Sequence, residues 1–346
     1  MHPALAALGR RVRPRTRLAA LGRRVRPRTR LLALARAAGS SPQRLRERRA
    51  AAVAARPIDH PSSLAFRREL LGLELANRFS RRPVVDSGSD VVVTMTTHGE
   101  RIRRVHVALE SIARGDARPA RLVLWLDDPA LAADLPRPLR RLQRRGLEVR
   151  LVESGYRVHT KYYPHLLSGR AGERDLVTSD DDIVYPRRWL RGLIDARSRY
   201  PRETVLCYRA HRVAVVDGAV APYTSWRPVA DTRARFDVFG TSVSGQLFPR
   251  ALMEEVARHG DAFREVAPDA DDIWLHVRAV DAGHRIAQIE PTAQLFPFVP
   301  RTQQTGLYLV NYWDGGNDRQ AAASYTPEAT ARIAGDATPD RQDPTA

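Results

Sequence analysis

The amino-acid sequence predicts an α/β fold in which a mainly parallel sheet is flanked by helices. Short apolar segments alternate with amphipathic segments of helical length over most of the 346 residues, which is typical of βαβ units. The hydrophobic content of 43% is enough for the core of one large domain or two small ones. Three aspartates, Asp180, Asp181 and Asp182, directly follow one apolar segment, at the position where open α/β sheets bind their ligands.

The expected strands are short runs rich in Val, Leu and Thr, residues that suit a pleated and half-buried surface. They span 91–96, 122–126, 147–152, 175–179, 204–208 and 285–289. The expected helices carry apolar residues three or four positions apart, as Phe66, Leu70 and Leu73 do in the first of them. They span 61–77, 102–114, 136–145, 186–200, 250–259 and 271–282. The last helix begins with acids and is followed by Gly283, which suits the helix dipole and a C-terminal glycine.

Residues 1–56 are expected to form a separate, arginine-rich tail. They hold sixteen Arg and one acid, Glu47, so they carry 16 − 1 = +15 of the total charge of +18, and the rest of the chain carries only 18 − 15 = +3. The segment LAALGRRVRPRTR occurs in tandem at 5–17 and 18–30, and Gly and Pro in each copy prevent it from building a core. We expect disorder, or short amphipathic pieces in peripheral contact with an anionic membrane. No nucleic-acid binding is expected of the nearly neutral remainder.

The folded part is expected over 57–320, and the polar segment 321–346 is expected to be a flexible tail. A single cysteine, Cys207, excludes an intrachain disulfide and a cysteine-based zinc cluster. No window approaches the roughly 18 apolar residues that cross a bilayer, and the N-terminus fits a cleaved signal peptide poorly. We therefore expect a cytoplasmic protein, with contact at the inner face of the membrane as an additional option.

The three consecutive acids Asp180–Asp182, called the aspartate triplet below, predict a cation site. Carboxylates this close together repel one another, and burying them is costly unless a cation compensates. Oxygen ligands from aspartate suit Mg²⁺ or Mn²⁺, ions that commonly link a diphosphate to a protein. The alternative is an acidic surface turn without a ligand.

Two further polar segments are candidates for binding a phosphorylated ligand. Thr96, Thr97 and Arg101 follow the first expected strand, where hydroxyls and backbone amides could hold a nucleotide and either Arg101 or Arg104 a phosphate. Lys161, the only lysine among 57 basic residues, is followed by Tyr162 and a second tyrosine, so an ammonium for phosphate stands beside rings that can stack on a base or sugar. Turn formation at the first segment and packing of the tyrosines at the second are the alternatives.

The acceptor side of a reaction is expected from two later segments. Gly245 and Gln246 lie in a run of small residues that would let a sugar approach the backbone. Asp271 and Asp272, called the acidic pair below, open a helix and could supply a general base for an acceptor hydroxyl, with Trp274 assigned to acceptor binding. An ordinary loop and simple helix capping are the respective alternatives.

The order of these motifs resembles the GT-A glycosyltransferases, which use nucleotide-sugar donors. Thr-Lys-Tyr-Tyr-Pro, Asp-Asp-Asp-Ile-Val-Tyr-Pro and Asp-Asp-Ile-Trp are similar to bacterial glycosyltransferases of surface polysaccharides, over roughly residues 88–318. The resemblance implies a GT-A-like, Rossmann-like fold in which the triplet matches the DxD motif. It places Asp180 toward the ribose or metal, makes Asp182 the strongest candidate for a metal ligand and Asp272 for the base.

One departure concerns the third metal ligand, which in many GT-A enzymes is a late histidine. No histidine follows His284 here, so a water molecule or one of several late polar residues would have to replace it: Asn311, Asp314, Asn317 or Asp318.

The resemblance implies a transferase that uses Mn²⁺ or Mg²⁺ and moves a sugar from a nucleoside-diphosphate sugar to a glycan or lipid-linked hydroxyl. In-line displacement would invert the anomeric centre, while the metal, Lys161 and Arg101 neutralise the leaving diphosphate. Two alternatives stay open. One is a sugar-1-phosphate nucleotidyltransferase, although the turn 96–102 lacks the Gly-rich basic loop usual in that class. The other is a non-enzymatic membrane or nucleic-acid adaptor that acts through the arginine-rich tail.

Overall fold

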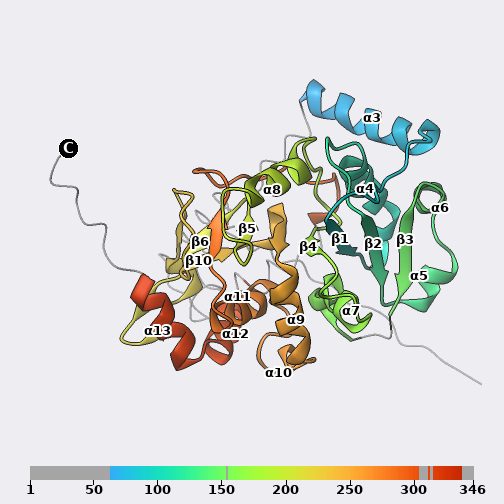
Figure 1. The fold of residues 1–346 in the computed structure, drawn as a ribbon. Coiled ribbons are helices and arrows are strands. Elements are labelled where there is room, and N and C mark those ends of the chain that lie inside the picture. Colours follow the sequence, from blue (N-terminus) through green and yellow to red (C-terminus); the bar gives the residue numbers. More distant parts are fainter. Residues whose placement is uncertain (1–62, 153–154, 304–310, 312–314, 337–346) are drawn as a thin grey trace, which may run out of the picture. The chain divides into compact units, whose positions relative to one another are not determined.

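The computed structural model describes residues 63–152, 155–303, 311 and 315–336. The arginine-rich tail 1–56 and Asp314 lie outside this described part. Its centre is a seven-stranded sheet in the order β12-β5-β11-β4-β1-β2-β3 (Figure 1). The strands are β1 Val91–Thr96, β2 Arg121–Leu126, β3 Leu147–Leu151, β4 Asp175–Thr178, β5 Val205–Cys207, β11 Gln246–Phe248 and β12 Ile286–Gln288.

The sheet is mainly parallel, as expected. The pairs β1–β2, β1–β4, β2–β3 and β5–β12 are parallel, whereas β11 runs antiparallel to both β4 and β5. From β1 the chain adds β2 and then β3 on one side and returns to place β4 on the other side. The carboxyl ends of β1 and β4 therefore border a topological switch point, where open α/β sheets form their ligand crevice.

Helices cover both faces of the sheet, so successive strand residues alternate between two cores. Val91, Val93 and Met95 of β1 pack into the core beneath one group of helices, while Val92 packs into the other. The first group is α3 Leu64–Phe79, α4 Val105–Ala113, α6 Arg137–Gln143 and α8 Trp189–Arg197. The second group is α7 Tyr163–Leu167, α9 Arg250–Arg258, α10 Phe263–Val266 and α11 Asp271–Asp281. The expectation of a parallel sheet flanked by helices is thus confirmed.

Short elements connect the sheet and carry much of the polar surface. They are α5 Pro129–Ala133 and the 3-10 turns η1 Gly99–Arg103, η2 Arg157–Lys161, η3 Tyr223–Ser225 and η4 Ser242–Ser244. A second, antiparallel sheet has the order β10-β6-β9, and β7 pairs with β8 in a hairpin. These strands are β6 Ala210–Arg212, β7 Val215–Val216, β8 Ala219–Val220, β9 Arg227–Pro228 and β10 Val238–Gly240.

The segment expected to be a flexible tail from residue 321 is instead helical as far as the structure describes it. Helices α12 Gly316–Ser324 and α13 Pro327–Asp336 pack against α11 and bury Ala321, Ala329 and Ile333. The prediction was wrong because the segment is polar overall. A few small apolar residues at helical spacing are enough to dock a helix whose other faces remain in water.

The expected helices and strands are all present, with their ends shifted by up to a few residues. The helix expected over 102–114 is divided, because η1 precedes α4. The run of small residues at 240–249, for which an ordinary loop was the alternative, contains the last residue of β10, the turn η4 and the buried strand β11. Among the described helices, none combines the length and the apolar character that crossing a bilayer requires.

A buried ion pair ties the first helices to one another and leads to a stability prediction. Glu110 of α4 is 1% exposed and accepts from Asn77 at 3.0 Å and from Arg145 at 2.6 Å. Glu110→Ala would leave the buried Arg145 guanidinium without its counter-charge, so we expect the free energy of unfolding to fall by about 3–5 kcal/mol. Urea denaturation measures this loss. The control Asp134→Ala breaks an exposed pair with Arg140 and should have little effect; similar losses in both variants would contradict the prediction.

Candidate active site

The aspartate triplet lies at the switch point, in a turn whose backbone is held by buried groups. Ser179 donates its N–H to the carbonyl of Thr94 at 3.0 Å, which continues the pairing of β4 with β1. The N–H of Asp180 donates to the Tyr185 hydroxyl at 2.8 Å, and Tyr185 is fully buried. The carbonyl of Asp182 accepts from Val299 at 2.7 Å. The turn is therefore fixed on both sides before any ligand binds.

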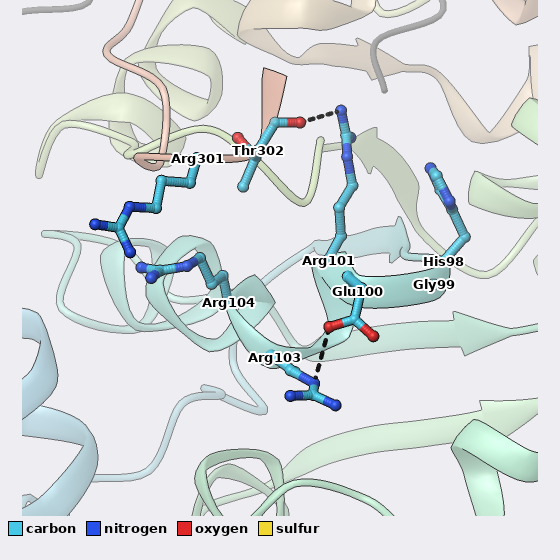
Figure 2. Close-up of a pocket in the computed structure, with 8 residues that line it drawn as sticks. All are labelled: His98, Gly99, Glu100, Arg101, Arg103, Arg104, Arg301 and Thr302. Atoms are coloured by element: carbon cyan, nitrogen blue, oxygen red, sulfur yellow. Dashed lines mark hydrogen bonds and ion pairs between the residues drawn. The ribbon is translucent and has the colours of Figure 1, made fainter. Parts of the chain in front are cut away.

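Arg101, from η1 after β1, holds two carboxylates of the triplet. Its guanidinium lies 2.8 Å from Asp181 and 3.1 Å from Asp182, and it donates to the carbonyl of Thr302 at 2.9 Å (Figure 2). Thr97 donates its hydroxyl to Asp181 at 2.5 Å. Two of the three residues expected after β1, Thr97 and Arg101, thus meet the triplet, but both bind Asp181 and are already engaged within the protein.

Lys161 joins the aspartate triplet to the acidic pair. Its ammonium lies 2.7 Å from Asp180 and 3.1 Å from Asp271, and the residue is 8% exposed. Burial alone would lower the pKa of Lys161, but the carboxylates of Asp180, Asp271 and Asp272 raise it well above its usual value. The lysine is therefore a fixed cation at neutral pH.

Asp272, at the start of α11, is held by residues of the preceding loop and strand. The backbone N–H of Ser242 donates to both of its carboxylate oxygens, at 3.0 and 3.1 Å, and the Ser242 hydroxyl donates to it as well. Gln246 donates through its side-chain amide at 3.2 Å. Burial and the neighbouring Asp271 raise the pKa of Asp272 to about 7, against the opposing effects of Lys161 and Ser242.

The charges of this site favour a further cation. The triplet and the acidic pair contribute −5 and Arg101 and Lys161 contribute +2, so the ion-paired cluster carries −5 + 2 = −3 when fully ionised. Burial, followed by the charges of Asp181 and Asp180, raises the pKa of Asp182 to about 7, although Arg101 and Gln303 oppose this. A cation near Asp182 would relieve the repulsion.

A metal at this site would have few protein ligands. Within the described ranges, no group of three or more His, Cys, Asp or Glu side chains is arranged to hold a metal ion. Asp180 and Asp182 fit an ion that retains several waters or phosphate oxygens, which is the usual behaviour of Mg²⁺. Of the alternatives for a third ligand, Asn311 donates to the carbonyl of Asp269 and Asp318 accepts from the N–H of Tyr223.

Two residues expected to bind the donor have side chains that bond within the protein instead. Tyr162, expected to stack on the donor, is 0% exposed and its hydroxyl bonds to His159, so it packs the core. Thr96 donates its hydroxyl to the carbonyl of Trp125. Both side chains are used within the protein, which agrees with the alternatives of packing and turn formation.

The three residues expected to bind the acceptor also serve the interior. Gly245 has φ +88°, and a Cβ there would meet the indole of Trp189 at 2.7 Å. Gln246 is buried in β11 beside Asp272, and Trp274 is 3% exposed and packs on Phe263. All three residues are buried, so none of them offers an exposed surface to an acceptor in the described part of the chain.

Sequence reasoning missed two residues that contact the carboxylates, and a third that holds Arg101. Ser242 holds Asp272, Gln303 donates to Asp182 at 2.8 Å, and the carbonyl of Thr302 holds Arg101. Ser242 lay in the run of small residues and could have been noticed as a hydroxyl there. Gln303 and Thr302 belong to no motif, and only the chain path after β12 brings them to the triplet.

A cavity of about 330 Å³ is lined in part by Arg101 and Thr302, the first of which also holds the aspartate triplet (Figure 2). Most of its lining is basic. The lining residues are His98, Gly99, Glu100, Arg101, Arg103, Arg104, Arg301 and Thr302.

Comparisons with known proteins leave the family open. No family model and no curated protein matches the chain. Among solved structures, the mannosyltransferase PcManGT from Pyrobaculum calidifontis, solved with GDP-Man and Mn²⁺, is 17% identical over 78% of this chain and 76% of that chain, with a TM-score of 0.45. GalNAc-T7, solved with UDP, GalNAc and Mn²⁺, is 12% identical over 66% of this chain and 50% of that chain, with a TM-score of 0.44.

A nucleotidyltransferase matches as well. The 4-diphosphocytidyl-2C-methyl-D-erythritol synthase from Anaerococcus prevotii is 11% identical over 67% of this chain and 97% of that chain, with a TM-score of 0.40. All these values are too low for the likeness to assign an activity.

The raised pKa of Asp272 predicts how stability depends on pH. Because this pKa is about 7 in the folded protein and about 3.9 for an unfolded aspartate, folding takes up a proton between these values. The wild type therefore loses stability as the pH rises through this window. Asp272→Asn removes the titrating group, so we expect the variant to be more stable than the wild type at pH 8, by on the order of 1–3 kcal/mol, and similar to it at pH 4.

Urea denaturation of both proteins across this pH range measures the difference. Asp195→Asn, on the exposed side of α8, is the matched control and should leave the wild-type pH dependence unchanged. A difference between Asp272→Asn and the wild type that does not vary with pH would show that Asp272 titrates normally.

Proposed function

We propose that this protein is a metal-dependent glycosyltransferase that moves a sugar from a nucleoside-diphosphate sugar to a hydroxyl acceptor with inversion. One observation carries the proposal: two acidic clusters distant in sequence meet at the switch point through Lys161. One cluster suits a cation and the other suits a base, and glycosyl transfer needs both within reach of one sugar ring.

The aspartate triplet is proposed as the donor side. Asp180 and Asp182 would hold Mn²⁺ or Mg²⁺, which when bound would neutralise charge on the leaving diphosphate. Arg101 and Lys161 orient the carboxylates in the free protein, since each is paired with two of them. The net charge of −3 on the five carboxylates with Arg101 and Lys161 supports the proposal. A negatively charged diphosphate would be repelled by it unless a metal cation binds with the diphosphate.

Asp272 is proposed as the general base and Asp271 as its companion. A base with a pKa of about 7 can accept a proton near neutral pH, where an ordinary aspartate would be too weak. The backbone N–H of Ser242 fixes the direction of the Asp272 carboxylate by donating to both of its oxygens. Asp272 itself lies in the first turn of α11, so the helix holds its backbone in place. A single displacement with this base would invert the anomeric centre.

The nature of the acceptor follows from the resemblance rather than from a described surface. We propose a glycan or lipid-linked acceptor in the synthesis of a bacterial polysaccharide. Peripheral contact of residues 1–56 with an anionic membrane would bring the enzyme to such an acceptor.

A sugar-1-phosphate nucleotidyltransferase is the second candidate, and the acidic pair distinguishes it. Synthesis of a nucleotide-sugar uses a phosphate oxygen that is already ionised, so it needs no carboxylate base with a raised pKa. The turn after β1 contains one glycine, Gly99, rather than a Gly-rich basic loop. Both features favour glycosyl transfer.

The proposal predicts separate losses from two substitutions. The wild type, screened by thermal shift against UDP, GDP, CMP and dTDP species, should be stabilised by one nucleotide only when Mn²⁺ or Mg²⁺ is present. Asp182→Asn should abolish this metal-dependent shift. Asp272→Asn should retain it but lower turnover of the matching nucleotide-sugar by about 10²–10⁴-fold, because only the base is lost.

The exposed Asp195→Asn is the control for both measurements. Release of pyrophosphate from a nucleoside triphosphate and a sugar-1-phosphate, with no hydrolysis or transfer from nucleotide-sugars, would favour the nucleotidyltransferase. Near-normal turnover in Asp272→Asn would refute the role of Asp272.

A further inference from the structure

The cavity beside Arg101 contains two arginines that nothing in the described protein neutralises. Arg101 is paired with the triplet and Arg103 with Glu100, at 3.1 Å. Arg104 and Arg301 point toward one another from different segments, and neither side chain has a hydrogen-bond or ion-pair partner among the described residues (Figure 2). Beyond these paired residues, the lining adds two uncompensated positive charges, those of Arg104 and Arg301. Such convergence is unfavourable unless an anion joins it.

The backbone at Arg301 supports a role in binding. Arg301 has φ +67°, in the left-handed region that side chains other than glycine rarely adopt. The next residue, Thr302, is 3% exposed, and its hydroxyl donates to the carbonyl of Val299 while its own carbonyl holds Arg101. The chain is thus anchored directly after the strained residue, and this anchor directs the Arg301 side chain into the cavity.

We infer that this cavity binds a phosphate group, with Arg104 and Arg301 as its ligands. Guanidinium groups bind phosphate through paired, charge-assisted hydrogen bonds, and a volume of about 330 Å³ accommodates a phosphate with part of the molecule that carries it. None of the five clustered aspartates lines the cavity, so the phosphate would lie beside the metal site and not within it. The phosphate group would belong either to the nucleotide or to a second substrate. The second possibility rests on the proposed function.

The test compares Arg104→Gln combined with Arg301→Gln against Arg103→Gln, a control that lines the same cavity but already has a carboxylate partner. Affinities of the full chain for inorganic phosphate and for the nucleotide of the donor screen are measured by thermal shift and calorimetry. The double variant should bind inorganic phosphate at least tenfold more weakly, and the control should bind it like the wild type.

The nucleotide measurement separates the two sources. A parallel tenfold loss for the nucleotide assigns the phosphate to the donor, whereas unchanged nucleotide affinity assigns it to another substrate. Absence of phosphate binding in the wild type, or equal binding in the double variant and the control, overturns the inference. The phosphate readout involves no sugar transfer, so its failure is distinct from failure of the proposed reaction.

A separate variant tests the strained backbone. Arg301→Gly relieves the left-handed conformation and removes the charge, so the free protein should melt at a higher temperature while phosphate binding falls. A lower melting temperature would show that the Arg301 side chain stabilises the fold, and it would contradict a binding role.

An independent observation concerns the outward face of α3. Four of its apolar side chains are exposed, Leu64 by 63%, Leu71 by 59%, Leu75 by 47% and Phe79 by 67%. At about 100° per residue they fall within an arc of about 80°. They make up half of the eight large apolar residues that are exposed in the described part of the chain. Phe66 and Leu73 on the opposite side fill the core, so α3 has two apolar faces.

The acidic and basic side chains of α3 also lie on different sides of the helix. Its acids turn toward the neighbouring elements, since Glu69 pairs with Arg114 and Glu74 with His106. Arg68 and Arg78 are exposed on the side of the apolar stripe. Leucine and phenylalanine interleaved with arginine are typical of helices that lie in the interface of an anionic membrane.

We propose that the outward face of α3 binds an anionic lipid surface. The segment 1–56 of the same chain is a poor alternative occupant, because its charge of +15 would oppose the exposed arginines. A second copy of α3 would bring the same arginines together. Anionic headgroups complement the arginines, and the acyl region accepts the stripe.

Vesicle flotation of the full chain tests this proposal, with phosphatidylcholine vesicles that either contain or lack phosphatidylglycerol. The variant with Leu71→Ser, Leu75→Ser and Phe79→Ser should bind anionic vesicles at least tenfold more weakly, and its melting temperature should be unchanged. The control carries Leu151→Ser, Leu167→Ser and Val216→Ser, which remove comparably exposed side chains elsewhere.

Equal flotation of the two variants overturns the proposal. If flotation of the α3 variant is unchanged but its protease sensitivity changes, another segment of the chain covers the apolar stripe. If its oligomeric state changes instead, a second copy covers the stripe. Either result would also overturn the proposal.

Discussion

The candidate site depends on one interaction, the bridge that Lys161 forms between Asp180 and Asp271. Without this ammonium, the carboxylates of the aspartate triplet and of the acidic pair would lie close together, largely buried, and repel one another. With it, the turn after β4 and the first turn of α11 are held together. Lys161 and Arg101 compensate only part of the negative charge of the five carboxylates, and the remaining negative charge favours a further cation.

The turn η2, which carries Lys161, is anchored to the segment before α11 through His159. In η2, His159 bonds to the carbonyl of Ala267 at 2.7 Å and stacks on Phe263, with ring centroids 3.9 Å apart. Burial lowers the pKa of this histidine to about 4, so it is neutral and adds no charge to the site. The segment that carries the lysine is thereby fastened to the stretch that leads into α11, and the distance across the bridge is set by packing.

Arg101 divides two regions of opposite charge. On one side its guanidinium contacts the carboxylates of Asp181 and Asp182, and on the other it lines the basic cavity with Arg104 and Arg301. A molecule with both a metal-bound diphosphate and another phosphate, or two substrates that carry one each, would match this division. With the proposed ligands, this arrangement would keep like charges on the two sides of Arg101 apart.

Much of the frame could be predicted from the sequence, because its signals are local. Strand β1 coincides with its expected bounds, the triplet does follow β4, and the acidic pair does open α11. Apolar periodicity reports which side of a segment is buried, and the carboxyl ends of parallel strands lie at one edge of the sheet, so polar residues that follow such strands can be expected at that edge.

What only the tertiary structure decided are the pairings between distant segments. Strand β11 is three residues long and pairs with β4, which places Gln246 beside Asp272 and buries Trp274 and Tyr162. No local pattern distinguishes such a strand from a loop, or a stacking ring from a packing ring. Burial depends on which elements lie opposite, and that is settled only when the whole sheet has assembled.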